Sequence, residues 1–272
     1  MSELFRGDDV RVTYGRGRHA NEVLKGVTIA IAPGETLGLV GESGSGKTTF
    51  GRALLGLVPL SGGSMSFDGE DITRLAPRAR RRLAKDVQVV FQDPYTSLNP
   101  SMTTRDILIE PLIAQGITKS IASAKVKALL DRVDMPSDAL HRYPREFSGG
   151  QRQRIAIARA LALDPRLIVC DEPVSALDLS TQQRVLDLLI ELQERTGVAY
   201  LFISHDLSVV RHVSHRVAVM YKGEIVEQGP AVQVTERPEH PYTKRLWAAN
   251  LVADPEEQAR RRGMRHPTPE EL

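Results

Sequence analysis

The sequence predicts an α/β fold with a mostly parallel core sheet. Residues 166–229 alternate apolar runs of strand length with helical patterns, and this order requires crossover connections between parallel strands. The first 72 residues contain strand-like segments, whereas residues from about 100 to 163 have helical spacing. We therefore expect a β-rich N-terminal part, an inserted helical part and a sheet completed by the last third of the chain.

The individual elements follow from local patterns. In the N-terminal third, the expected strands are residues 9–14, 26–31, 35–40 and 64–72, the last with an Asp68-Gly69 turn signal. In the insert, residues 120–133 form a helical pattern whose broad apolar face would consist of Ile121, Val126, Leu129, Leu130 and Val133. In the last third, we expect strands at 166–170, 198–204, 215–220 and 223–229, and helices at 181–196 and from Leu207.

Composition narrows the class of protein. The 36 basic and 34 acidic residues of this 272-residue chain give a net charge of +2, so nucleic acid is not expected as a partner. The single cysteine, Cys170, excludes an intrachain disulfide. The first residues lack the apolar core of a secretion signal, and no apolar stretch is long enough to span a membrane. We expect a cytoplasmic protein, and any path across a bilayer would come from other chains.

Residues 41–48, "GESGSGKT", match the pattern of a phosphate-binding loop and lie between an apolar strand and a helix. Glycines let backbone N–H groups turn toward phosphates, Lys47 would reach the β and γ phosphates, and Thr48 would offer a hydroxyl to Mg²⁺. The alternative is a glycine-rich turn without a ligand. The residues expected to bind the nucleotide are Gly41, Glu42, Ser43, Gly44, Ser45, Gly46, Lys47, Thr48 and Thr49.

Polar side chains follow two later strands of the predicted sheet. Asp171 and Glu172 follow the apolar run "RLIVC", and His205 follows "LFIS". Ligands of open parallel sheets bind beyond the carboxyl ends of the strands, so these residues should approach the nucleotide. Asp171 would hold Mg²⁺, and Glu172 would orient and deprotonate the attacking water. A helix cap followed by a first-turn acid is the alternative for the acids, and packing or capping is the alternative for His205.

A second glycine turn, "SGGQ", opens a helix at Ser148. Ser148 and Gln151 fit a capping box, which alone would indicate an ordinary capped helix. The adjacent Gly149 and Gly150 weaken a helix start, and such glycines otherwise permit close approach to an anion. The sequence thus contains two candidate phosphate-binding turns about a hundred residues apart.

These motifs occur in one order: "GESGSGKT", "FQDPYTSLNP" with Gln92, "FSGGQRQR", "LIVCDEP", "SALD" and His205. Over residues 9 to 230 the chain resembles the ATPase subunit of an ATP-binding cassette (ABC) transporter. The resemblance implies the P-loop NTPase fold of ABC ATPases, with an antiparallel β subdomain, an inserted helical subdomain, and ATP and Mg²⁺ as cofactors. It also implies a head-to-tail dimer in which the signature turn of one subunit closes over the ATP of the other.

The resemblance assigns further roles residue by residue. Ser148, Gly149, Gly150 and Gln151 would contact the partner's ATP, and Asp178 would help to join the two sites. Gln92 would reach Mg²⁺ and the attacking water, His205 would hold the γ-phosphate, and Tyr14 would stack on adenine. Two positions differ from the usual family pattern: Phe147 replaces the leucine that begins the signature, and Cys170 replaces an aliphatic residue. Neither change removes a polar contact.

The importer branch of the family is indicated by the "FQDPY" form of the glutamine segment and by "RPEHPYTKRLWAA" at residues 237–249, although the latter could be a simple turn and helix. Both are similar to ATPases of dipeptide, oligopeptide and nickel importers. That resemblance implies two transmembrane permease subunits, an extracytoplasmic substrate-binding protein and a location at the cytoplasmic face of the membrane. It also implies a second cassette, for which a related chain is preferred over an identical one. Because no cysteine lies in the C-terminal region, we expect no metal cluster.

We expect a single ATPase domain over residues 1–252, with a helical insert at about 100–163, a C-terminal extension at about 230–252 and a flexible tail at 253–272. Two other functions stay open at this point. One is an ATPase or regulatory ATP-binding module that acts with soluble partners instead of a transporter. The other, a small-molecule kinase, leaves "SGGQ" and "SALD" unused.

Overall fold

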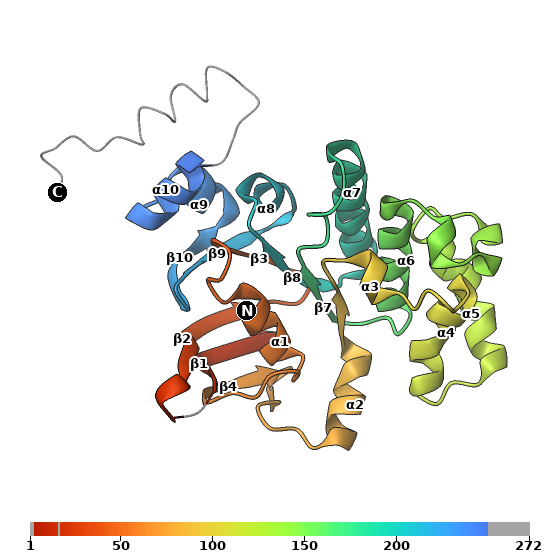
Figure 1. Ribbon diagram of the computed structural model, residues 1–272, viewed down its shortest axis with the longest axis horizontal. Helices are drawn as coiled ribbons and strands as arrows, with labels where there is room; N and C mark the ends of the chain where they lie inside the picture. The colour runs from red at the N-terminus through yellow and green to blue at the C-terminus, as the bar shows by residue number, and fades with distance from the viewer. Residues whose placement is uncertain (1–2, 16, 250–272) are drawn as a thin grey trace, which may run out of the picture.

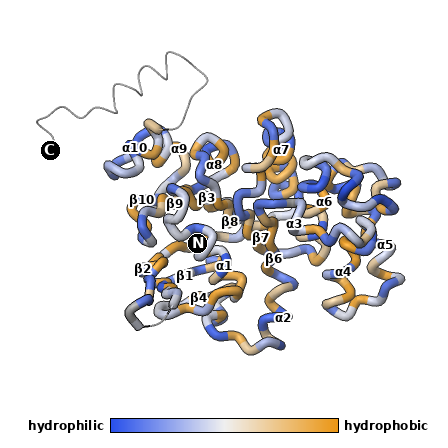
Figure 2. The backbone as a smooth tube through the Cα atoms, viewed as in Figure 1, coloured by the Kyte–Doolittle hydropathy of each residue, from blue (hydrophilic) through white to orange (hydrophobic). Residues whose placement is uncertain are grey.

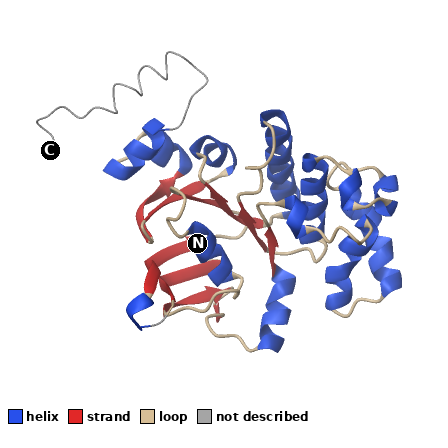
Figure 3. Cartoon of the chain, viewed as in Figure 1, coloured by secondary structure: helices blue, strands red, loops and turns tan. Residues whose placement is uncertain are grey.

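The computed structural model describes residues 3–15 and 17–249, which are arranged around two sheets (Figure 1). The tail expected at 253–272 lies outside the described residues. The larger sheet has the strand order β10-β9-β3-β8-β7-β6, and the smaller sheet has the order β2-β1-β4-β5. Figure 3 shows the smaller sheet beneath the larger one, with a group of helices to one side. This is the combination of sheets and helices that the sequence predicts.

The larger sheet is parallel except at one edge, where β10 runs antiparallel to β9. Its strands are β3 (Thr36–Val40), β6 (Val87–Val90), β7 (Leu167–Asp171), β8 (Ala199–Ser204), β9 (Arg216–Tyr221) and β10 (Glu224–Pro230). The smaller sheet is antiparallel throughout. It consists of β1 (Phe5–Tyr14), β2 (Asn21–Ile31), β4 (Gly62–Phe67) and β5 (Glu70–Asp71).

Both faces of the parallel sheet are buried, and alternate residues of its strands pack into different cores. In β8, Leu201 and Ile203 join the core shared with the antiparallel sheet, whereas Tyr200 and Phe202 join the core beneath the helices. Because side chains on both faces are buried, the strands are continuous apolar runs instead of alternating ones. Figure 2 shows such hydrophobic segments at β6 and β7. Because both faces are covered, a ligand can reach the sheet only at the ends of its strands.

Helices cover the sheet on both sides. The α-helices are α1 (Lys47–Leu54), α2 (Pro77–Asp86), α3 (Pro94–Ser97), α4 (Thr104–Ala114), α5 (Lys119–Asp131), α6 (Gly149–Leu161), α7 (Leu179–Thr196), α8 (Leu207–Val213), α9 (Ala231–Glu236) and α10 (Pro241–Ala249). Short 3₁₀ turns occur at Gly17–His19, Ser137–His141 and Pro144–Glu146. In the described part of the chain, no helix is both long and apolar enough to cross a membrane.

Helix α5 corrects one prediction. Ile121, expected on the buried face, is 56% exposed, whereas Ala122 is fully buried. The buried positions start at Ala122 and continue with Val126, Leu129 and Leu130, which is the i, i+4, i+7, i+8 spacing of one helical face. Ile121 lies one residue, about 100° of rotation, away from the start of that face. Ile121 was therefore assigned to the buried face because it is apolar, although its position on the helix faces away from the core.

The start of α6 packs closely against α7 through Gly150. A Cβ atom added to Gly150 would lie 2.3 Å from Cγ2 of Thr181, a distance far below van der Waals contact. The second glycine of the "SGGQ" turn therefore has a packing role inside the chain. This role was not foreseen from the sequence, where the glycine pair suggested only close approach to an anion.

We predict that Gly150→Ala destabilises the protein although it improves helix propensity. Alanine gains roughly 0.5–1 kcal/mol over glycine in a helix, whereas overpacking costs typically 1–3 kcal/mol. The difference is a net loss of about 0–2.5 kcal/mol, and the 2.3 Å contact places the loss that we expect in urea unfolding in the upper half of that range. Thr181→Ser removes the clashing methyl group, so the double variant should recover most of that loss. Equal stability of Gly150→Ala and the parent would contradict this packing account.

Candidate functional site

The first glycine turn connects β3 to α1 in a conformation that requires glycine. A Cβ atom at Gly41 would lie 2.2 Å from the Met220 carbonyl oxygen, and Gly46 caps α1 with a φ of 113°. β3 is buried along its whole length, so the loop begins at a fixed point of the sheet. The backbone therefore curls around a concave surface at the N-terminus of α1, where N–H groups and the helix dipole favour an anion.

Lys47 is a buried cation in this loop. Its side chain is only 5% exposed, and Nζ donates to the carbonyl oxygens of Gly41 (2.8 Å) and Glu42 (2.9 Å). Burial lowers the pKa of Lys47, whereas the neighbouring carboxylates, Glu172 first among them, oppose the shift. Ser45 Oγ is also buried, and within the described residues it has no hydrogen-bond partner. A buried cation and an unpaired hydroxyl in a glycine-rich loop at a helix N-terminus fit a polyphosphate.

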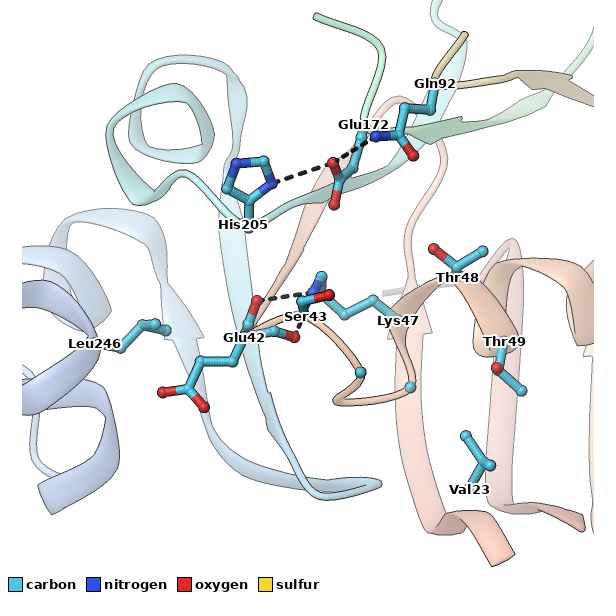
Figure 4. Close-up of a pocket in the computed structure, with 13 residues that line it drawn as sticks. Val23, Glu42, Ser43, Lys47, Thr48, Thr49, Gln92, Glu172, His205 and Leu246 are labelled. Carbon is cyan, nitrogen blue, oxygen red and sulfur yellow. Dashed lines mark hydrogen bonds and ion pairs between the residues drawn. The ribbon is translucent and has the colours of Figure 1, made fainter. Parts of the chain in front are cut away.

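The loop forms one wall of a pocket of about 780 Å³ (Figure 4). Residues 41–44 and 46–49 line it, together with Gln92, Glu172 and His205. Val23 and Leu246 complete the lining. The volume suits a ligand of nucleotide size.

Asp171 lies at the end of β7 and contacts the phosphate loop. Its Oδ1 accepts a hydrogen bond from Thr48 Oγ1 at 2.9 Å. Burial raises the pKa of Asp171, and the hydrogen bond from Thr48 opposes that shift. A hydroxyl and a carboxylate are hard oxygen donors that suit Mg²⁺. In residues 3–15 and 17–249, no three His, Cys, Asp or Glu side chains form a metal-binding group, so a cation at this position would need phosphate or water oxygens as further ligands.

Glu172 brings the other predicted catalytic residues together. Its Oε2 accepts a hydrogen bond from Gln92 Nε2 at 3.2 Å and lies 3.1 Å from His205 Nδ1. Figure 4 shows Gln92 and His205 approaching this carboxylate from opposite sides, with Lys47 across the pocket. The Glu172 backbone has a φ of 48°, a strained conformation for a non-glycine residue, and its N–H donates to the Ile203 carbonyl at 3.0 Å. The side chain, 17% exposed, is therefore held in one place.

The signature turn lies apart from this pocket. Ser148 caps α6: Ser148 Oγ accepts the N–H of Gln151 at 3.3 Å, and Gln151 Oε1 accepts the N–H of Ser148 at 3.0 Å. This is the capping box expected from the sequence. Neither these two residues nor Gly149 and Gly150 line the phosphate-loop pocket. Within one chain, the two candidate phosphate-binding turns do not form one site.

Two other predicted site residues also lie outside the pocket lining. Asp178 caps α7 by accepting from Ser180 Oγ (2.7 Å) and from the Thr181 N–H (3.1 Å), and these hydrogen bonds lower the pKa of Asp178 to about 2. Tyr14 is the last residue of β1 and is 42% exposed. Their proposed contacts with a partner and with adenine stay predictions.

Sequence reasoning missed part of the pocket wall. Val23 comes from β2 and Leu246 from α10, and both line the space beside the loop. Tyr242 of α10 also accepts a hydrogen bond from the Glu42 N–H at 3.0 Å. The "HPYT" segment was the available signal, because it includes Tyr242, but from the sequence it indicated only the importer branch, with a turn and a helix as the alternative.

Comparisons with known proteins agree with this geometry. The sequence profile of the ABC transporter family matches residues 24–175. The chain is 55% identical over 233 residues to the glutathione import ATP-binding protein GsiA of Escherichia coli (strain K12), and 52% identical over 235 residues to GsiA of Pectobacterium atrosepticum. These alignments cover 85% and 86% of this chain but 37% and 38% of the relatives, so the chain spans little more than a third of their length.

Solved structures show the same architecture. The dimeric ATP-binding cassette MJ0796, in a post-hydrolysis state with ADP and Pi, has a TM-score of 0.75 at 28% identity over 84% of this chain and 99% of that one. CbiO1 of Clostridium perfringens, from the cbiONQ ABC transporter complex, has a TM-score of 0.79 at 23% identity over 98% of this chain and 100% of its own, which supports the fold alone. The predicted fold class is confirmed by these neighbours, and the matched profile shows that the chain belongs to the ABC transporter family.

Proposed function

We propose that this chain hydrolyses ATP as the nucleotide-binding subunit of an importer for peptide-class solutes. One observation carries the proposal: the Glu172 carboxylate, held by Gln92 and His205, faces the same pocket as the Lys47 loop. A phosphate-binding loop opposite an oriented carboxylate is the arrangement that hydrolysis of a nucleoside triphosphate requires. The relatives named as glutathione import ATP-binding proteins support it.

The side chains divide the work of the proposed reaction. Lys47 and the loop N–H groups bind the β and γ phosphates, and Glu172 accepts a proton from the attacking water. Gln92 and His205 orient the Glu172 carboxylate through the contacts that they make with it. Thr48 and Asp171 would hold Mg²⁺, and Gln92, which lines the same pocket, would be a further oxygen ligand. The cation would neutralise charge on the phosphate oxygens.

We further propose that the second phosphate-binding turn serves the partner cassette. Ser148, Gly149 and Gly150 would contact the γ-phosphate held by the other subunit, and Asp178 would help to join the two sites. The position of the turn outside its own pocket and the dimeric assembly of the MJ0796 cassette support this arrangement. A related cassette is the preferred partner. Residues 1–252 would act as one domain, with residues 100–163 moving as its helical insert.

The remaining components follow from the importer proposal. The cassette pair would dock at the cytoplasmic face of the membrane on two permease subunits, which receive cargo from an extracytoplasmic binding protein. For the cargo, we propose a short peptide: the relatives' names specify glutathione, and the "HPYT" segment resembles dipeptide, oligopeptide and nickel importers. Uptake of labelled glutathione, dipeptides and Ni²⁺ by cells with and without the gene would test this. Uptake of all three that is unchanged by the deletion would contradict the proposal.

Glu172→Gln should abolish turnover while leaving ATP binding intact. The amide keeps the shape and one hydrogen-bonding oxygen of the carboxylate but cannot accept the proton, and general bases contribute about 10²–10⁴-fold in rate. We expect at least a hundredfold loss of phosphate release and an ATP dissociation constant within about twofold of the parent. Glu191→Gln, at an exposed surface pair, is the matched control. Full hydrolysis by Glu172→Gln would remove Glu172 as the base.

Ser148→Phe should block the ATP-driven dimer. A bulky side chain at the start of α6 would occupy the space proposed for the partner's phosphate. In the Glu172→Gln background, which should hold ATP uncleaved, we expect sedimentation velocity with ATP and the partner cassette to show separate subunits instead of the dimer. Thr118→Phe places the same bulk at the exposed start of α5 and should leave the dimer intact. An unaltered dimer of the Ser148 variant would count against the shared site.

A further inference from the structure

The C-terminal helix α10 contacts the phosphate loop directly. Tyr242 is 2% exposed, and its hydroxyl oxygen accepts a hydrogen bond from the backbone N–H of Glu42 at 3.0 Å, across 200 positions of sequence. Leu246, one turn further along α10, lines the nucleotide pocket, and Figure 4 shows its side chain directed toward Glu42. Helix α10 is therefore part of the wall of the pocket.

The peptide unit that joins Gly41 to Glu42 is held from both ends. The Gly41 carbonyl oxygen accepts from Lys47 Nζ at 2.8 Å, and the Glu42 N–H donates to Tyr242 at 3.0 Å. Because a peptide unit is planar, fixing the direction of its N–H also fixes the direction of its C=O. The hydroxyl of Tyr242 thus helps to set the position of the oxygen that Lys47 uses.

Contacts on β9 and β10 hold Tyr242 in place. The Glu227 carboxylate on β10 accepts the backbone N–H groups of Glu239 (2.8 Å) and His240 (3.1 Å), and His240 Nδ1 accepts the N–H of Tyr242 at 3.1 Å. The ring of Tyr242 lies against that of Tyr221, at the end of β9, with centroids 4.2 Å apart. The tyrosine hydroxyl is therefore presented to the loop by a pre-organised support rather than by a free side chain.

These contacts give each member of "HPYT" a physical role. His240 accepts the N–H of Tyr242 in the first turn of the helix, and Pro241 occupies the first helical position, where no N–H is needed. Tyr242 reaches the phosphate loop, and Thr243 is fully buried beneath the helix. His240 and Pro241 thus shape the start of the helix that presents Tyr242 to the loop.

We propose that Tyr242 is a positioning residue of the nucleotide site, acting through the Gly41–Glu42 peptide to hold the phosphate loop in its anion-binding shape. The proposal rests on the ATPase function proposed above. Its ligand class is the polyphosphate of a nucleotide, not the base, because the contact is made to the backbone of the phosphate loop. The C-terminal segment is then a structural part of the nucleotide site.

Tyr242→Phe in the full-length chain tests the hydroxyl, because phenylalanine keeps the buried ring. A net neutral hydrogen bond accounts for roughly two- to tenfold in an equilibrium constant. We expect the dissociation constant of a fluorescent ATP analogue and the KM for ATP to rise by about that factor. The loop holds the phosphates in ground and transition states alike, so kcat should change by less than about twofold. The dissociation constant of a fluorescent GTP analogue should rise by the same factor.

Tyr221→Phe is the matched control. It removes a hydroxyl from the other ring of the stacked pair, and among the described residues that hydroxyl has no hydrogen-bond partner. Its nucleotide affinity should equal that of the parent. Parental affinity of Tyr242→Phe would overturn the proposal, and so would an equal loss in both variants, because that would assign the effect to ring packing.

Lys47→Ala separates failure of this proposal from failure of the ATPase assignment. If Lys47→Ala still binds and hydrolyses ATP at the parental rate, the proposed function is wrong, and the role of Tyr242 fails with it. If Lys47→Ala loses both while Tyr242→Phe equals the parent, only the role of Tyr242 is wrong. Thermal unfolding of all three variants shows whether a loss of affinity follows a loss of fold, which would also overturn the positioning role.

Discussion

The parallel pairing of β3, β8, β7 and β6 is the constraint on which the nucleotide pocket depends. Val40 pairs with Ser204, Asp171 with Ile203, and Val90 with Cys170, so the four strands end at nearly the same level. The phosphate loop, His205, Glu172 and Gln92 follow these ends. A slip of one residue would also exchange the two cores, because alternate side chains belong to different faces. Burial of the two faces thus fixes the register, and the register places the functional groups.

The same burial sets the electrostatics of the pocket. It lowers the pKa of Lys47 and raises that of Asp171, because each charged form loses contact with water. Opposing interactions limit both shifts, since carboxylates surround the lysine and the Thr48 hydroxyl donates to Asp171. The negative charge of a triphosphate would complement Lys47, and the positive charge of a divalent cation would complement Asp171. The site is therefore best matched by a ligand that carries both signs of charge.

Features encoded over a few residues could be predicted from the sequence. The strand, glycine loop and helix around Lys47 form one local pattern, and so does the capping box of Ser148 and Gln151. The convergence of Glu172 and His205 required one further rule, that parallel strands end at a common edge, whereas Gln92 was assigned by the family resemblance alone. The features that escaped prediction join distant segments. Gly150 packs on Thr181, and Tyr242 contacts Glu42 across 200 positions, and neither pairing leaves a local signature.

The start of α6 shows how one turn can have a structural role and still be open to a ligand. The capping box satisfies the N–H of Ser148 and that of Gln151. Within the described part of the chain, no acceptor is found for the N–H groups of Gly149 and Gly150, which are the first two of the helix and have no intrahelical partner. Gly150 must be small because α7 packs against it, and a Cβ atom at Gly149 would lie 3.3 Å from Cδ2 of Leu177. The cap thus fixes the direction of two free N–H groups at the positive end of the helix dipole. A phosphate held by a second cassette would accept hydrogen bonds from both of them.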